Sequence, residues 1–176
     1  MDTFVDGLNL GPFYGFDEKD SYVNPDPDKV KAGRCNPYYI PYLYAAESSY
    51  TAIVEVRPSL NSYINVAEIE ILDDLRIFNI AMKDIITDRT SILRNVLSSR
   101  FSRIVNDYQD RQYLATQCIT EYIKNLGYDG LKFDSSLDKE GTNVVVFDTA
   151  KCKAISSSVH TICGITYSTR RDVPYP

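Results

Sequence analysis

The run Val144-Val145-Val146-Phe147 is the sequence feature that most constrains the fold. Valine is branched at Cβ and favours extended backbone, so residues 143–147 are predicted to form a strand. No polar residue interrupts the apolar run, and the strand is therefore expected to be buried on both faces. A chain of 176 residues is long enough to bury such a strand within one domain.

Two longer segments have the pattern of helices. Residues 116–126 are predicted to form a helix, with Lys124 in its last turn and Gly127 just after its end. Residues 85–108 have a second helical pattern. The apolar stripe of the first helix is predicted to face the core and consists of Cys118, Ile119, Tyr122, Ile123 and Leu126.

Further strands are expected where β-branched or alternating residues recur, at 40–45, 63–72, 75–80 and 130–133. Residues 153–167 are expected to add a further strand or a hairpin. Strands and helices follow one another without a regular βαβ repeat, which indicates a mixed α/β or α+β domain. We expect one domain over residues 1–176. It would comprise an irregular segment at 1–33, a core at 34–167 and a frayed tail at 168–176.

The formal net charge of −5 argues against general binding to nucleic acid or to an anionic membrane. No apolar run approaches the roughly 18 residues of a membrane span. The first ten residues also lack the basic start and apolar centre of a signal peptide. A cytoplasmic location is therefore expected.

The four cysteines are scattered, without a C-x-x-C pair that would suggest zinc, and are expected to be free buried thiols. They are Cys35, Cys118, Cys152 and Cys163. His160, the one histidine, lies in an alternating stretch and is interpreted as an ordinary strand residue. No metal site is predicted.

Arg34 and Glu55 are the candidate functional residues. Arg34 lies in a loop bounded by Gly33 and Pro37, where its guanidinium is a fork of donors suited to phosphate. Its alternative role is an ion pair with an aspartate of the preceding loop, Asp26 or Asp28.

Glu55 is expected in the last turn of a short helix that is capped by Ser48 or Ser49 and runs through Val56. The alternative for this segment is a strand, which its β-branched residues would also suit. Apolar neighbours on either side would hold the Glu55 carboxylate in apolar surroundings. Its alternative role is an ion pair with Arg57 or Lys31. A phosphate-binding arginine and such a carboxylate together suit a nucleotide that carries a sugar.

Five blocks of the chain, in order, resemble the RES domain family, which is named for an arginine, a glutamate and a serine. They are Gly33-Arg34-x-Asn36-Pro37, Ile40-Pro41-Tyr42-Leu43-Tyr44-x-Ala46-Glu47, Thr51-Ala52-Ile53-x-Glu55-Val56-Arg57-Pro58, Gln112-Tyr113-Leu114-x-Thr116-Gln117 and Gly127-Tyr128-Asp129-Gly130. The serine of the family name corresponds to Ser135 or Ser136, and Ser135 is preferred from its distance to Gly130.

The resemblance implies an α+β fold similar to that of ADP-ribosyltransferases, a split, twisted β core with flanking helices that clasps NAD. It implies a toxin that consumes NAD by hydrolysis or phosphorolysis, without a metal, and that a helix-turn-helix antitoxin restrains. A homodimer is compatible with it. The alternatives are a protein ADP-ribosyltransferase using the same pocket and a catalytically silent module that binds a nucleotide or a partner.

The resemblance also implies roles for individual residues. Glu55 would stabilise the positive charge that develops on the ribose, and Arg34 would bind the pyrophosphate. Tyr44 would stack on nicotinamide, and Ser135 would bind the ribose or the diphosphate, unless it only caps a turn. Asn143 is a further expected contact to NAD.

The resemblance also implies another arginine-rich segment ahead of the region that matches Pro12-Phe13-Tyr14, and we expect this chain to lack it. If that segment contacts phosphate, this part of the binding site is expected either to be absent here or to be supplied by another residue such as Arg57.

Overall fold

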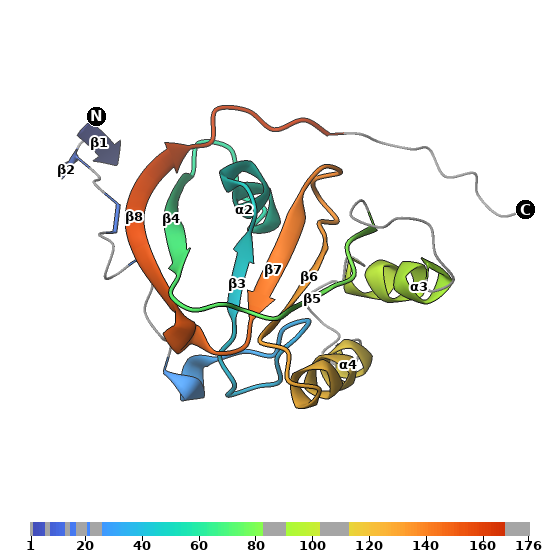
Figure 1. The fold of residues 1–176 in the computed structure, drawn as a ribbon. Coiled ribbons are helices and arrows are strands. Elements are labelled where there is room, and N and C mark those ends of the chain that lie inside the picture. Colours follow the sequence, from blue (N-terminus) through green and yellow to red (C-terminus); the bar gives the residue numbers. More distant parts are fainter. Residues whose placement is uncertain are drawn as a thin grey trace, which may run out of the picture.

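The valine run forms an inner strand of a four-stranded sheet in the computed structural model (Figure 1). This strand, β7 (Thr142–Val146), pairs antiparallel with β3 (Leu43–Ala46) on one side and with β6 (Gly130–Asp134) on the other. Strand β5 (Ile77–Asn79) completes the sheet by pairing in parallel with β6. Four of the five residues of β7 are buried, which confirms the prediction that both of its faces are covered.

The structure describes residues 2–5, 8–12, 15–16, 21, 26–82, 91–102 and 113–167. A second, antiparallel sheet consists of β4 (Tyr63–Ile71) and β8 (Cys152–Thr161) and lies beside the first (Figure 1). The helices are α2 (Ser49–Glu55), α3 (Ser91–Phe101) and α4 (Leu114–Asn125), with the 3-10 turns η1 (Pro27–Lys29) and η4 (Thr149–Lys151). This mixture is compatible with the predicted α+β class. Within the described ranges, no helix has the length and apolar character needed to cross a membrane.

The N-terminal segment contains regular structure that the sequence analysis does not predict. Within residues 1–33, strands β1 (Asp2–Val5) and β2 (Leu8–Pro12) pair antiparallel. The available sequence signal is Asp6-Gly7, a dipeptide that favours a two-residue hairpin turn between two strands. The predicted tail at 168–176 lies outside the described residues. Of the predicted helix at 85–108, the described part is α3 with Ser102.

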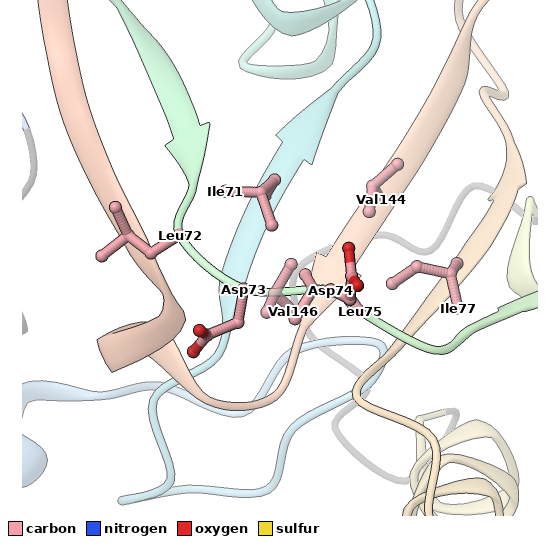
Figure 2. Close-up of a pocket in the computed structure, with 8 residues that line it drawn as sticks. All are labelled: Ile71, Leu72, Asp73, Asp74, Leu75, Ile77, Val144 and Val146. Atoms are coloured by element: carbon pink, nitrogen blue, oxygen red, sulfur yellow. The ribbon is translucent and has the colours of Figure 1, made fainter.

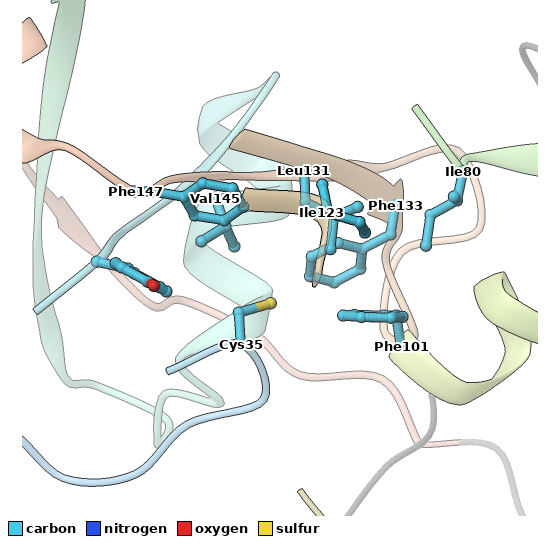
Figure 3. Packing of buried hydrophobic residues seen from close by; sticks show 9 residues of the cluster. Cys35, Ile80, Phe101, Ile123, Leu131, Phe133, Val145 and Phe147 are labelled. Atoms are coloured by element: carbon cyan, nitrogen blue, oxygen red, sulfur yellow. The ribbon is translucent and has the colours of Figure 1, made fainter. Parts of the chain in front are cut away.

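The main core joins side chains of α3 and α4 to side chains of the four-stranded sheet. Figure 3 shows these side chains, among them Phe101 of α3 and Ile123 of α4. Phe101 of α3 and Phe133 of β6 are both almost fully buried, with ring centroids 5.7 Å apart. Burying a side chain of this size contributes about 1.5–3 kcal/mol. The buried cluster consists of Cys35, Tyr42, Ile80, Phe101, Ile123, Leu131, Phe133, Val145 and Phe147.

Helix α4 buries a different face from the predicted one. Three members of the predicted stripe are exposed, namely Cys118, Tyr122 and Leu126. Ile123 is buried, but the other buried residues of the helix are Thr116 and Thr120. The helix packs against the 33–37 loop, whose backbone carbonyls require donors: the Thr116 hydroxyl donates to the Arg34 carbonyl at 2.7 Å. Thr116 and Thr120 are therefore buried, although neither belongs to the apolar stripe that was predicted to face the core.

The cysteines divide into two classes rather than being uniformly buried. Cys35 and Cys152 are buried, whereas Cys118 and Cys163 are exposed, and all four are free. Burial raises the pKa of the Cys35 thiol to about 12, and burial also raises the pKa of Cys152. Because the thiolate is the reactive form, only the exposed pair is expected to react in the native state.

We predict that a disulfide reagent such as DTNB, at about pH 8, modifies only Cys118 and Cys163 rapidly in the folded protein. All four thiols should react once the chain is unfolded in guanidinium. Cys35 and Cys152 should then account for the difference between the two titrations. Rapid reaction of all four thiols without denaturant would contradict the described packing.

Candidate active site

The loop that carries Arg34 is organised by the buried side chain of Asn36, which is 3 % exposed. Its amide nitrogen lies 3.0–3.1 Å from three backbone carbonyls, those of Lys31, Pro37 and Ile40. These contacts close the loop on itself, because carbonyls that are buried without water need a donor. The buried Asn36 amide is therefore a central polar contact of the loop, which also places Cys35 in the apolar core.

Tyr44 of β3 attaches this loop to the sheet. Its hydroxyl donates to Asn36 Oδ1 at 2.7 Å and accepts from the Cys35 backbone N–H at 2.9 Å. Burial of that hydroxyl raises the pKa of Tyr44 far above its usual value, with a further contribution from the neighbouring Cys35. The residue as a whole remains 45 % exposed. Its hydroxyl is thus structural, while part of the ring remains accessible.

Helix α4 holds the same loop from the other side. Gln117 donates to the carbonyls of Gly33 and Asn36 at 2.8 and 2.9 Å. At Gly33, an added Cβ would lie 2.5 Å from Asn36 Oδ1 and 2.8 Å from the Tyr44 hydroxyl oxygen. A glycine is required there because any side chain would collide with the two oxygen atoms that form the hydrogen bond between Asn36 and Tyr44.

The Arg34 guanidinium lies over the ring of Phe133, 5.7 Å from the ring centroid. Phe133 pairs directly with Asn143 across strands β6 and β7. Side chains of directly paired residues lie on the same face of a sheet, with Cβ atoms roughly 4.5–5.5 Å apart. Arg34 is therefore brought to the sheet face that carries Asn143.

Glu55 lies in the last turn of α2, as the sequence predicts, and the helix ends at this residue, one position before the predicted Val56. Ser48 caps the helix by accepting from the Thr51 backbone N–H at 3.0 Å. Glu55 Oε1 accepts two hydrogen bonds, from the Ser135 hydroxyl at 2.6 Å and from the Asn143 side-chain amide at 2.7 Å. Among the residues that the structure describes, no hydrogen bond to Glu55 Oε2 is found. The carboxylate is anchored by one oxygen and presents the other.

Ser135 follows the end of β6 and is 8 % exposed. Its oxygen accepts from the backbone N–H groups of Leu137 and Asp138 at 3.1 and 3.0 Å, while its proton is donated to Glu55. Ser135 thus caps a turn, which is the alternative role considered for it, and it also contacts Glu55. Its expected contact to the ribose or the diphosphate stays a prediction.

The two remaining expected site residues have other placements. Ser136 is half-buried, and it is Ser135 that contacts Glu55. Arg57 is exposed just beyond α2 and has a left-handed backbone, with φ of 49°. Its expected contact to phosphate stays a prediction.

A hollow of about 670 Å³ lies on the other face of β7 (Figure 2). Its lining consists of Ile71, Leu72, Asp73, Asp74, Leu75, Ile77, Val144 and Val146. Because side chains alternate along a strand, Val144 and Val146 point away from the face that carries Asn143. None of the expected site residues lines this hollow, which is separate from the Glu55 cluster.

The structure is a mixed domain of helices and sheets, compatible with the α+β class, in which a helix-terminal glutamate is hydrogen-bonded to a strand-end serine and an asparagine. The loop arginine lies over Phe133, which is paired with that asparagine. The RES domain family model matches residues 13–175, nearly the whole chain, and the protein belongs to the RES domain family. Searches of curated proteins and of solved structures gave no match. Membership in the family suggests a toxin-like, NAD-related function as a broad class.

Replacing Asn36 by alanine is expected to lower the free energy of unfolding by about 1–3 kcal/mol, because buried carbonyls and the Tyr44 hydroxyl lose their partner. Urea denaturation monitored by circular dichroism measures the change. Asn95→Ala is the matched control, since Asn95 is exposed on α3 and its replacement should change stability by less than about 0.5 kcal/mol. Equal stability of the two variants would show that Asn36 does not hold the loop.

Proposed function

We propose that this protein is a toxin-type enzyme that consumes NAD by cleaving the bond between nicotinamide and ribose, through hydrolysis or phosphorolysis. The observation that carries the proposal is the state of Glu55. Two donors fix one of its carboxylate oxygens, and within the described structure the other oxygen accepts no hydrogen bond. That oxygen is suited to accept a hydrogen bond from a ribose hydroxyl.

The chemistry requires little more than a positioned negative charge. When the C1′–N bond breaks, its electron pair leaves with nicotinamide, which departs as a neutral molecule, and positive charge develops on the ribose as in glycoside hydrolysis. A fixed carboxylate stabilises that charge. The oxygen of water or phosphate then bonds to C1′, and when water reacts its proton is released to solvent. The leaving group is already cationic, so no acid needs to protonate it.

The other site residues would bind the rest of NAD. Arg34 would bind the pyrophosphate, because a guanidinium offers two parallel donors to phosphate oxygens. The accessible part of the Tyr44 ring would stack on nicotinamide, since its hydroxyl is already engaged in the loop. Arg57, exposed beyond α2, would supply a further phosphate contact. The fold would be the ADP-ribosyltransferase-like split β core that the family resemblance implies, an assignment with which the two adjacent sheets are compatible.

We predict that Glu55→Gln reduces NAD cleavage by about 100-fold or more, because the amide lacks the charge that stabilises the transition state. The fold should be retained, since the amide oxygen of glutamine can still accept from Ser135 and Asn143. Release of nicotinamide, measured by chromatography, gives the rate, and thermal unfolding tests the fold.

The matched control is Glu70→Gln, which neutralises an exposed carboxylate on β4 and should leave the rate unchanged. Wild-type turnover by a folded Glu55→Gln protein would remove Glu55 from the reaction. Radiolabelled NAD distinguishes the acceptor: label that becomes bound to protein would favour protein ADP-ribosylation over hydrolysis or phosphorolysis.

A further inference from the structure

Helix α2 has little means of fixing its own position. It has only seven residues, and isolated helices of fewer than about 12–15 residues are marginal in water. Its one buried residue is Thr51, which is 1 % exposed. Apolar residues of the helix such as Ile53 and Val54 are only half-buried, so polar contacts to the rest of the domain contribute to the placement of Glu55.

Such contacts exist one turn before Glu55. Thr51 precedes Glu55 by four residues, so the two side chains lie on the same face of α2. The Thr51 hydroxyl donates to Asp138 Oδ2 at 2.7 Å. Because its single proton is used in that bond, the Ser48 hydroxyl, 2.7 Å away, is the donor to Thr51 Oγ1.

Asp138 lies in the same turn that Ser135 caps. The Asp138 backbone N–H donates to Ser135 Oγ at 3.0 Å, and its carboxylate receives the Thr51 hydroxyl. Helix and turn are thus joined twice, once through Thr51 with Asp138 and once through Glu55 with Ser135. The bond between Thr51 and Asp138 holds α2 and the turn at the distance that the bond between Glu55 and Ser135 requires.

The neighbouring residue Gly141 shows how closely this contact is packed. An added Cβ at Gly141 would lie 2.5 Å from Asp138 Oδ2 and 2.6 Å from Thr51 Oγ1. A side chain there would separate the two oxygens. The backbone of the 135–142 segment therefore approaches α2 as closely as a glycine permits.

We infer that Thr51 and Asp138 are positioning residues for Glu55, with Ser48 and Gly141 supporting their contact. This inference rests on the proposed function for its catalytic consequence. The positioning itself does not depend on which substrate is bound.

The test uses the full-length protein with Thr51→Val, which keeps the side-chain shape and removes the hydroxyl, and Thr51→Ser, which restores it. Thr51→Val should lower kcat for NAD cleavage roughly 10- to 100-fold with KM little changed, because the carboxylate is misplaced in the transition state. Thr51→Ser should recover most of the loss. Ser49→Ala, an exposed change on the same helix, is the control and should behave as wild type.

A second readout is independent of activity. The side-chain amide signals of Asn143, assigned by their disappearance in Asn143→Ala, report its hydrogen bond to Glu55 in NMR spectra. They should shift toward the position of an unbonded amide in Thr51→Val and stay in place in Thr51→Ser and Ser49→Ala. If Thr51→Val folds poorly, Asp138→Ala removes the same bond from the half-buried turn residue and should give the same shift.

Unchanged Asn143 signals and unchanged kcat in a folded Thr51→Val or Asp138→Ala protein would overturn the inference. Failure of the wild-type protein to cleave NAD would instead defeat the proposed function. In that case the Asn143 signals still decide whether Thr51 and Asp138 position Glu55.

Discussion

The pair of hydrogen bonds to Glu55 Oε1 is the interaction on which the candidate site depends. Ser135 and Asn143 come from the end of β6 and the start of β7, while Glu55 ends a helix whose one buried residue is polar. These bonds attach α2 to the central sheet and leave one carboxylate oxygen for a ligand. The Glu55 side chain therefore has two roles: it attaches α2 to the sheet, and it is the proposed catalytic group. Its hydrogen bonds help to orient α2 in addition to the apolar packing of the helix.

The Arg34 side of the site follows the same principle. Asn36 and Tyr44 close the loop through hydrogen bonds, and Thr116 and Gln117 of α4 satisfy carbonyls on its other side. A buried loop can be held this way because each buried backbone group finds a partner. The apolar core, which includes Cys35, stabilises the folded domain, and the polar contacts fix the conformation of the loop. Arg34 is thereby held over Phe133, next to the strand that carries Asn143.

Local patterns predicted much of this arrangement. The serine cap and the end of α2, the burial of β7 and the position of Ser135 at a strand end all follow from short-range residue preferences. The face of α4 could not be predicted that way, because Thr116 and Thr120 are buried against a loop that is distant in sequence. The partners of Glu55 are equally non-local: Ser135 and Asn143 lie 80 and 88 residues away, so charge alone pointed to Arg57 or Lys31 instead.

The most direct test of the central claim is a crystal structure of the Glu55→Gln protein with NAD bound. The account predicts a ribose hydroxyl within hydrogen-bond distance of the outer atom of residue 55, with Ser135 and Asn143 still on its other atom. The pyrophosphate should contact Arg34. NAD bound in the hollow lined by Val144 and Val146, with residue 55 free of contact to the ribose, would contradict it.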